Sequence, residues 1–156
     1  EGLDGVRLTI IGEGPLRDEL AARVENDERL RSCVDLRGVV TDAELAAAYQ
    51  EHNVFVAPSV SRAESFGISM AEALCNGLPT ISSALGTGTD WVNEDGVSGL
   101  VVEPKGVAAL RAALVTLQNQ QTWERYSVGA RTLGQQRYNA GAHFDQLMKH
   151  YEAAVQ

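Results

Sequence analysis

The sequence predicts an α/β fold, a Rossmann-like three-layer α/β/α domain with a mainly parallel sheet. Five short apolar runs alternate along the chain with segments of helical periodicity. Turns that contain glycine or proline separate the two kinds of segment. With 156 residues, 44% of them hydrophobic, the chain is long enough to bury a core of its own. We therefore expect one domain over residues 1–156.

Composition narrows the classes of partner and compartment. A formal net charge of −8 argues against nucleic-acid binding, because phosphate backbones are bound by stripes of Lys and Arg. No apolar run approaches the length of a membrane span, so we expect no transmembrane segment. The low cysteine usage makes a reducing cytoplasm the expected compartment. Cys33 and Cys75 are too few and too far apart for a disulfide framework, and each is expected as a small buried side chain.

Residues 6–11 form the first predicted strand, which ends at a turn containing Gly12 and Gly14 before an amphipathic helix. These glycines invite comparison with the dinucleotide-binding fingerprint. The third small position of that fingerprint is Arg17 here, and the second strand ends near Arg37 instead of an acidic residue. The sequence thus disfavours an NAD-binding domain. The glycines still suit a turn that brings backbone close to a ligand, and an ordinary β–α turn is the alternative.

The second predicted strand covers residues 33–40, and the third covers residues 54–57. Between them, Thr41 is followed three residues later by Glu44, the spacing of a capping box at the start of a helix. We therefore expect a second β–α unit between the first strand and the central part of the chain.

A loop and a helix follow the third strand. The helix is expected to start near Gly67, because apolar residues recur at helical spacing from Ile68, and Gly77 supplies a stop. The first backbone N–H groups of a helix have no partner within it, and the carboxyl end of a parallel strand is where open α/β sheets bind ligands. The amides of Phe66, Gly67 and Ile68 therefore predict an anion site, with phosphate as its natural ligand.

Two carboxylates flank this predicted anion site. Glu64 lies in the loop and Glu72 lies about one turn into the helix, so one could meet a sugar and the other a ribose. An alternative interpretation is that acidic residues near a helix start merely stabilise its dipole, by about 0.3–1 kcal/mol. Composition alone favours this second interpretation.

The rest of the chain contains two further predicted strands, at residues 79–83 and 99–104, joined by a glycine-rich loop and a short helix expected to begin at Trp91. The residues after the fifth strand follow a helical pattern whose apolar stripes are expected in the core. The loop offers backbone amides and hydroxyls to a ligand oxygen. The groups concerned are those of Gly86, Thr87, Gly88 and Thr89.

The ordered set of motifs around the two carboxylates closely resembles the signature of retaining GT-B glycosyltransferases of the glycogen-synthase and sucrose-synthase type. Glu64 and Glu72 are separated by seven residues. The flanking motifs are Pro58-Ser59 before them, Phe66-Gly67 between them, and Gly77-Leu78-Pro79-Thr80-Ile81 after them. The resemblance covers nearly the whole chain. It implies that residues 1–156 are the C-terminal donor-binding half of a GT-B fold, with the N-terminal acceptor domain absent from this chain.

The resemblance also implies an activity. The full-length protein would transfer a sugar, with retention, from a nucleotide-diphosphate sugar to an acceptor such as a growing polysaccharide, a lipid-linked glycan or another glycoconjugate. The acceptor would be bound through the missing domain, and the parent protein could associate peripherally with the inner membrane face. The isolated domain would be inactive. The last helix would cross back onto the N-terminal domain, which leaves an apolar surface exposed when that half is absent.

Individual roles follow from the same resemblance. Glu64 would be the catalytic residue, orienting the transferred sugar and stabilising charge near its anomeric carbon, and Glu72 would bind the ribose hydroxyls. Val40 would lie against the nucleobase, although a plain strand exit is the alternative. The donor-binding set is completed by Ser65, Phe66, Gly67, Ile68, Gly12 and Gly14.

No cofactor and no metal ion are expected, because no Asp-x-Asp motif occurs in the chain. The loop sequence Gly86-Thr87-Gly88-Thr89 departs from the Gly-Gly form that is commoner in the family, so the contacts of this loop with the donor stay open. The departure suggests a subfamily that uses deoxyhexose or mannose-like donors. The alternative function is a non-catalytic nucleotide- or sugar-phosphate-binding module.

Overall fold

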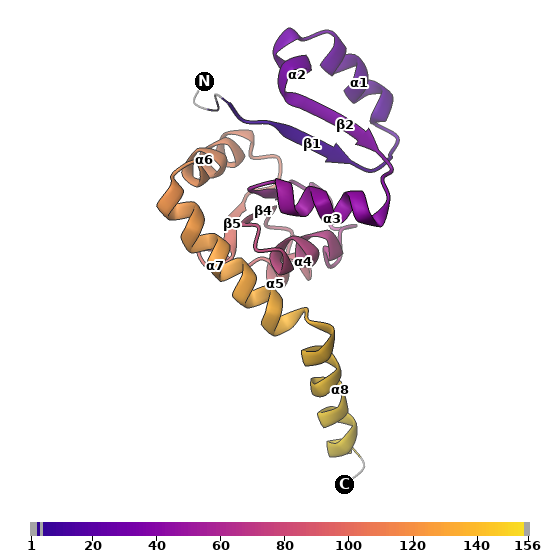
Figure 1. Cartoon of the computed structure of the whole chain (residues 1–156), viewed down its shortest axis with the longest axis vertical. Helices are drawn as coiled ribbons and strands as arrows, with labels where there is room; N and C mark the ends of the chain where they lie inside the picture. Colours follow the sequence, from indigo (N-terminus) through magenta and orange to yellow (C-terminus); the bar gives the residue numbers. More distant parts are fainter. Residues whose placement is uncertain (1–2, 4, 155–156) are drawn as a thin grey trace. The chain divides into compact units, whose positions relative to one another are not determined.

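The computed structural model describes residue 3 and residues 5–154, apart from the side chains of residues 140, 142, 143 and 146. It divides into two compact units, Glu1–Ala48 and Tyr49–Gln156. Figure 1 shows the chain coloured from its N-terminus to its C-terminus, with most of the elements labelled. All five predicted strands are present, each one to three residues shorter than expected.

The first unit is built on a parallel pair of strands, β1 and β2. Leu8 lies opposite Val34, and the register shifts at the end of the pair so that Ile11 lies opposite Gly38. The side chain of Asp27 caps α2 by accepting hydrogen bonds from two backbone amides of its first turn. The elements of this part of the chain are β1 (Leu8–Ile11), α1 (Arg17–Glu25), α2 (Glu28–Cys33), β2 (Val34–Gly38) and α3 (Asp42–Glu51).

The predicted capping box at the start of α3 is confirmed. The backbone N–H of Thr41 donates to the Glu44 carboxylate at 2.7 Å, and the N–H of Glu44 donates to the Thr41 hydroxyl at 3.3 Å. The backbone N–H of Thr41 and, at 2.7 Å, its hydroxyl both donate to the Glu44 carboxylate, and these two hydrogen bonds hold the pKa of that carboxyl below its ordinary value. Two amides at the helix start, which would otherwise lack partners, are satisfied reciprocally.

The second unit contains a three-stranded parallel sheet in the order β3-β4-β5. The predicted parallel pairing is therefore confirmed, with the described strands paired in two sheets, one in each unit. The elements are β3 (Phe55–Ala57), α4 (Ile68–Cys75), β4 (Thr80–Ser83), α5 (Thr89–Val92), β5 (Gly99–Val102), α6 (Val107–Leu117), α7 (Gln120–Arg137) and α8 (Ala140–Ala154). The short helix α5 begins at Thr89, two residues before the expected start.

Apolar clusters cover both faces of this sheet, so the second unit has the predicted three layers. Phe55 and Ala57 contribute to one cluster, while Val54 and Val56 contribute to the other, because successive side chains of a strand point to opposite faces. The first cluster is formed mainly by Met70, Ala71, Leu74, Val92, Ala130 and Leu133 of α4, α5 and α7. The second is formed mainly by Ile81, Ala113, Leu117 and Tyr126. Each fully buried Leu or Met contributes about 1.5–3 kcal/mol.

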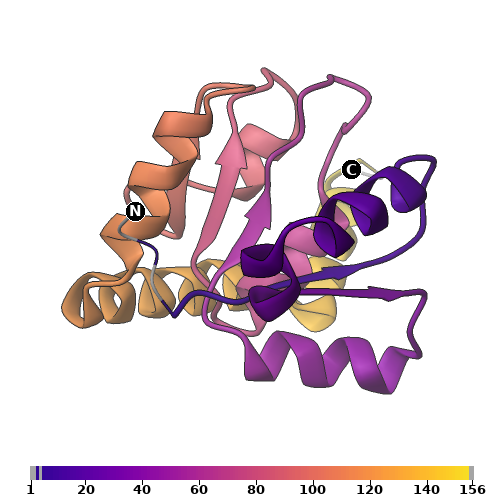
Figure 2. The same ribbon diagram turned by 90° about the horizontal axis from the view of Figure 1, so that it is seen from above.

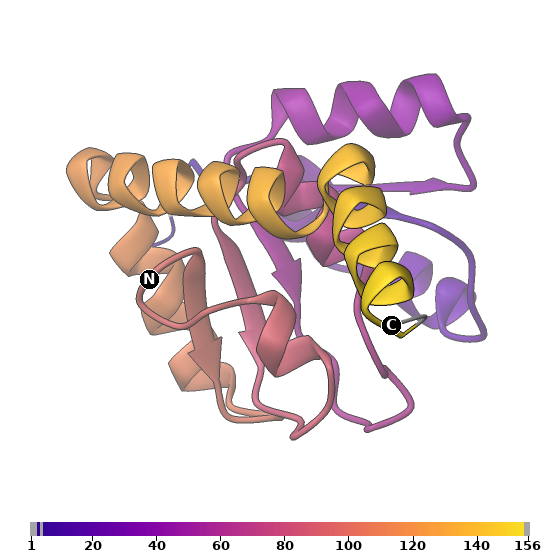
Figure 3. The same ribbon diagram turned by 90° about the horizontal axis from the view of Figure 1, so that it is seen from below.

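Helix α7 crosses the amino ends of the three strands, as Figures 2 and 3 show. Its Trp123 indole donates to the carbonyl of Asn53 at 2.7 Å, and its Ser127 hydroxyl donates to the carbonyl of Gly77 at 2.7 Å. These carbonyls precede β3 and β4. The same helix passes so close to the residues before β5 that a Cβ on Gly129 would overlap the Val97 carbonyl. The loops that carry the predicted site lie at the opposite, carboxyl ends of the strands.

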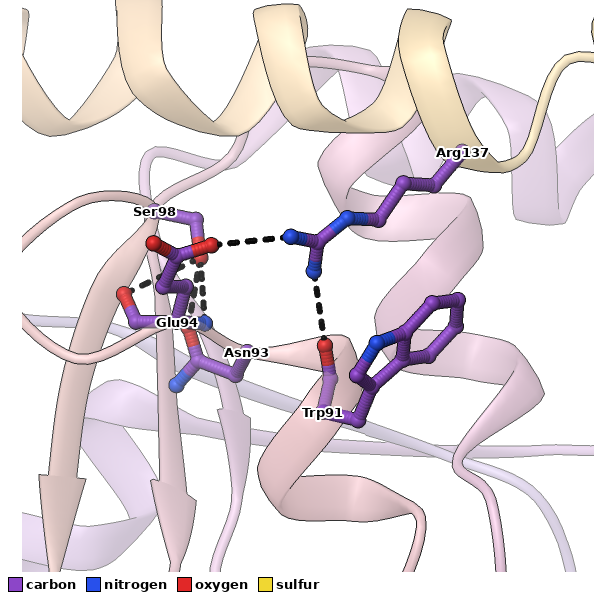
Figure 4. A network of polar contacts seen from close by, with 5 residues as sticks. All are labelled: Trp91, Asn93, Glu94, Ser98 and Arg137. Atoms are coloured by element: carbon purple, nitrogen blue, oxygen red, sulfur yellow. Dashed lines mark hydrogen bonds and ion pairs between the residues drawn. The ribbon is translucent and has the colours of Figure 1, made fainter.

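A polar network joins the end of α7 to the turn after α5 (Figure 4). The buried Asn93 side chain donates to the carbonyls of Thr80 and Leu100 and to the Ser82 hydroxyl, at 2.9–3.2 Å. Its own carbonyl accepts from the Ser98 hydroxyl at 3.0 Å. This network fixes the β4–β5 connection from inside the protein.

Arg137 extends that network to the surface. Its guanidinium donates to the Glu94 carboxylate at 3.1 Å and to the carbonyl of Trp91 at 3.0 Å, and lies 5.0 Å from the centre of the Trp91 ring. The Trp91 ring in turn neighbours those of Phe66 and Tyr138. The aromatic group therefore links the end of α7 to the loop that precedes α4.

Two expectations about burial are wrong. Cys75 is exposed and Cys33 is half-buried, so neither is a buried side chain of the core. Burial of part of its surface and the nearby Glu72 carboxylate still raise the pKa of the Cys75 thiol. The apolar stripe of α8, expected in a core from its helical spacing, is instead exposed, since α8 turns away from α7 (Figure 3). This exposure agrees with the apolar surface that the family resemblance implies for the last helix. The residues of this stripe are Phe144, Leu147, Met148 and Tyr151.

Candidate functional site

The start of α4 lies at the carboxyl end of β3, as the sequence predicts. Gly67 is the residue before the first helical turn and has a left-handed backbone, with φ 88° and ψ 59°. A Cβ at this position would overlap the Met70 side chain, so glycine alone fits without rearrangement. The helix continues to Cys75 and ends before Gly77, which has φ 77°. Both predicted boundaries are confirmed.

The backbone amides predicted to bind an anion are available at this helix start. The first hydrogen bonds of the helix run from the N–H groups of Met70 and Ala71 to the Gly67 carbonyl, at 3.0 and 3.1 Å. Within the part of the chain that the structure describes, the amides of Phe66 and Ile68 donate to no protein acceptor. Both side chains are also accessible, with 39% of Phe66 and 69% of Ile68 exposed. Such amides, together with the helix dipole, can hold a negative charge.

The two predicted acidic residues are both exposed, and so is Ser65. Glu72 lies four residues after Ile68 along α4, which places its Cα about 6 Å further along the helix axis. Glu64 precedes the helix, in the loop between β3 and α4. The structure therefore places one carboxylate before the free amides and one after them in the same unit.

The glycine-rich loop between β4 and α5 is folded around Asp90. The carboxylate of Asp90 accepts from the N–H of Leu85 at 3.1 Å and from the N–H of Gly86 at 2.8 Å. The Thr89 hydroxyl lies 3.2 Å from the same carboxylate and 2.9 Å from the Thr87 hydroxyl. The amide of Gly86 and both threonine hydroxyls, expected to face a ligand, therefore have partners within the protein.

This loop is tied to the loop that carries Glu64. The Thr87 hydroxyl donates to the Glu64 carbonyl at 3.0 Å, and the Arg62 guanidinium donates to the Gly86 carbonyl at 3.0 Å. A Cβ on Gly88 would lie 2.6 Å from the Ser65 carbonyl oxygen, so the two backbones touch there. Local sequence patterns predicted no role for Arg62 or Asp90. Asp90 directly follows two Gly-Thr pairs in the sequence. Because Asp side chains often accept hydrogen bonds from nearby backbone amides, this pattern could have indicated its role in the loop.

Glu72 is held by Tyr49, a residue to which local sequence patterns assigned no role. The hydroxyl of Tyr49 donates to the Glu72 carboxylate at 2.9 Å and lies 3.2 Å from the Ser69 carbonyl. The Tyr49 ring packs against Phe55, with ring centres 6.1 Å apart. Burial, and after it the hydrogen bond with Glu72, raise the pKa of the Tyr49 hydroxyl above its ordinary value of 10.

Three further predicted donor-binding residues belong to the first unit. Gly12, with φ 121°, donates its N–H to the Gly38 carbonyl at 2.7 Å, which joins the turns at the carboxyl ends of β1 and β2. The carbonyl of Gly14 accepts from the N–H of Arg17 at 3.1 Å at the start of α1. Val40 is half-buried and follows Gly38 by two residues. These residues therefore lie beyond the carboxyl ends of their own strand pair, the edge at which open α/β sheets commonly bind ligands.

An open depression of about 570 Å³ in the second unit does not coincide with the predicted site. Two of its carboxylates have structural roles, since Asp90 caps the glycine-rich loop and Asp95 accepts from the N–H of Val101 at 2.9 Å. Its lining consists of Ala84, Asp90, Asn93, Asp95, Val101, Val102, Glu103 and Ala109. In the described residues, no three His, Cys, Asp or Glu side chains gather as a possible metal site.

The helices that the structure describes include none with the length and apolar character needed to cross a membrane.

Comparison with known proteins finds a matching family and similar sequences. Residues 1–120 match the family of glycosyl transferases group 1. The chain is 40% identical over 140 residues to D-rhamnosyltransferase WbpZ of Pseudomonas aeruginosa, which covers 90% of this chain and 34% of that protein. It is 33% identical over 150 residues to O-antigen chain mannosyltransferase C of Escherichia coli, covering 96% of this chain and 40% of that one.

The structure is also similar to that of HepE from Anabaena in complex with UDP. The TM-score is 0.79 at 20% identity, over 95% of this chain and 41% of that one. This chain thus spans less than half the length of the relatives it matches. The family match over residues 1–120 shows that the chain belongs to the group 1 glycosyltransferases, with the Rossmann-like α/β fold of GT-B enzymes.

Proposed function

We propose that this chain is the donor-binding domain of a retaining glycosyltransferase that transfers a sugar from a nucleotide-diphosphate sugar to an acceptor glycan or glycoconjugate. The observation that carries the proposal is the start of α4, where free backbone amides lie between Glu64 and Glu72 in the chain, at the carboxyl end of a parallel strand. Family membership makes a nucleotide sugar the natural ligand for such an arrangement.

Departure of the nucleotide develops negative charge on the diphosphate as the anomeric bond breaks. The amides of Phe66, Gly67 and Ile68 would stabilise that charge without rearrangement, because the left-handed Gly67 fixes their orientation. Glu72 would accept hydrogen bonds from the ribose hydroxyls. Glu64 would orient the transferred sugar and stabilise positive charge near its anomeric carbon. No metal ion is required in this scheme.

The remaining predicted residues would serve the nucleoside. Gly12 and Gly14 form a turn in which the backbone can approach the nucleotide, and Val40 would lie against the base. The named activities of the relatives, a mannosyltransferase and a rhamnosyltransferase, support a mannose-like or deoxyhexose donor. We expect the acceptor site in a part of the protein outside this chain, since the chain covers 34–40% of those relatives, and we expect this chain alone to be inactive.

The test uses the full-length protein that contains this domain. Calorimetry with UDP and GDP measures nucleotide affinity, and a mass-spectrometric assay over a panel of nucleotide sugars measures transfer. We expect Glu72→Ala to weaken nucleotide binding, and Glu64→Ala to lower turnover more than donor affinity. Glu124→Ala is the matched control, because Glu124 is exposed on α7, which crosses the opposite ends of the strands.

Two outcomes would contradict the proposal in different ways. Unchanged kinetics in both Glu64→Ala and Glu72→Ala would remove the site assignment. Binding of a nucleotide sugar without transfer to any acceptor, by the full-length protein, would favour the non-catalytic binding module.

A further inference from the structure

The side chain of Tyr49 is hydrogen-bonded to Glu72, a residue of the predicted site. It lies in the last turn of α3, and its hydroxyl reaches the Glu72 carboxylate in the second turn of α4, 23 residues further along the chain. The distance of 2.9 Å is that of a good hydrogen bond. Tyr49 is half-buried and Glu72 is exposed, so a fixed group holds a side chain that would otherwise be mobile.

The hydrogen bond has a defined direction. A hydroxyl carries one proton, and the Tyr49 oxygen lies near two acceptors, the Glu72 carboxylate at 2.9 Å and the Ser69 carbonyl at 3.2 Å. The carboxylate is the closer of the two acceptors and, because it is charged, also the stronger one. Since burial and Glu72 itself raise the pKa of Tyr49, the phenol remains protonated and remains a donor throughout the physiological range.

The carboxylate retains capacity for a ligand. An ionised Glu has two oxygens with about four acceptor positions, and the Tyr49 hydroxyl uses one of them, on Oε2. Two neighbouring hydroxyls of a ribose can occupy positions on Oε1 and Oε2 that remain. Fixing the side chain before the nucleotide arrives avoids the entropy lost on ordering it during binding.

We propose that Tyr49 is a positioning residue that holds the Glu72 carboxylate in the orientation that binds the ribose hydroxyls of the donor nucleotide. The inference rests on the proposed function, in which Glu72 is the ribose ligand. Removal of the hydroxyl alone, with the ring left in place, weakens binding only of nucleotides that carry ribose hydroxyls. The alternative is that Tyr49 acts only through the packing of its ring on Phe55, in which case its hydroxyl has no part in binding.

The experiment compares the full-length protein with its Tyr49→Phe, Glu72→Ala and Tyr49→Phe/Glu72→Ala variants by calorimetry. The ligands are UDP or GDP, whichever the wild type binds more tightly, and the corresponding 2′,3′-dideoxynucleoside diphosphate. We expect Tyr49→Phe to weaken binding of the ribonucleotide about threefold to tenfold, the range for the net loss of one ordinary hydrogen bond. Affinity for the dideoxy ligand should stay unchanged, and Tyr49→Phe should have no further effect in the Glu72→Ala background.

Tyr126→Phe is the matched control, because Tyr126 lies in the apolar cluster on the opposite face of the sheet from Phe55, the residue against which Tyr49 packs. Equal losses for the ribose and dideoxy ligands, or a loss that persists in the Glu72→Ala background, would show that Tyr49 acts only on the fold. A loss in Glu72→Ala without any in Tyr49→Phe would overturn this inference and leave the proposed function intact. Wild-type affinity in Glu72→Ala would overturn the assignment of Glu72, and this inference with it.

Discussion

The hydroxyl of Thr87 donates a 3.0 Å hydrogen bond to the main-chain carbonyl of Glu64, across a gap of 23 residues in the sequence. Thr87 lies between Gly86 and Gly88 in the glycine-rich loop. Its side chain therefore holds the backbone of the proposed catalytic residue. A glycine at position 87 would offer no such hydroxyl.

We expect Thr87→Val to lower the turnover of the full-length enzyme about 2- to 10-fold, with a smaller change in the KM for the donor. Valine has the shape of threonine without its hydroxyl, so the change removes a hydrogen bond worth about 0.5–1.5 kcal/mol while filling the same space. Thr87→Ser keeps the hydroxyl and should retain most of the turnover. Equal turnover in both variants would show that the bond to Glu64 does not matter for the reaction.

We expect Gly134→Ala to destabilise the protein by about 1–3 kcal/mol, as overpacking does. A Cβ on Gly134 would lie 2.6 Å from the backbone nitrogen of Cys75, because α7 and α4 touch at this point. Helix propensity alone favours alanine over glycine by about 1 kcal/mol, so the expected sign is opposite to that of an exposed position. Urea unfolding measures the difference, with exposed Gln135→Ala as the control. A gain in stability would mean that the helices separate easily.

We expect Asn93→Ala to lower the free energy of unfolding by about 2–4 kcal/mol, because several buried polar groups lose their partner together. Thermal or urea unfolding provides the measurement. Glu94→Gln, in the partly exposed ion pair with Arg137, should cost less than about 1 kcal/mol. Similar losses in the two variants would contradict the distinction between the buried and exposed parts of the network.

The capping box of α3 predicts a dependence on pH. The hydrogen bonds from Thr41 lower the pKa of Glu44 in the folded state below its ordinary value of 4.5. The stabilisation is therefore fully present above about pH 4.5 and is lost as the pH falls through the folded-state pKa. Unfolding followed from pH 7 to pH 3 should show a smaller acid-induced loss of stability in Glu44→Gln than in the wild type. Parallel curves for the two proteins would argue against this role of the carboxylate.

Local signals predicted most of the secondary structure. The start of α4 at Gly67 and the capping box at Thr41 and Glu44 both depend on residues within one turn of each other, and both are confirmed. Strand periodicity placed all five strands, and their alternation with helices indicated parallel pairing. These features follow from local chemistry, so one sequence suffices to find them.

Contacts between distant residues could not be predicted in the same way. Tyr49 lies in the last turn of α3, and nothing in its local sequence indicates that its hydroxyl meets Glu72. Cys75 sits beside apolar residues in the sequence, yet it is exposed in the fold. The apolar stripe of α8 has the spacing of a core helix, yet its exposure depends on where the chain turns after Tyr138. Such outcomes are decided by tertiary packing.

The loops that precede α4 and α5 each give one hydrogen bond to the other, from Arg62 to the Gly86 carbonyl and from Thr87 to the Glu64 carbonyl. A reciprocal link of this kind couples their motions. Neither loop can swing outward alone without breaking both bonds, so entry of the donor and escape of the spent nucleotide would be governed by a joint opening of the two. Substitutions confined to residues 84–90 would then change residence times at the Glu64 loop, even where they touch no ligand.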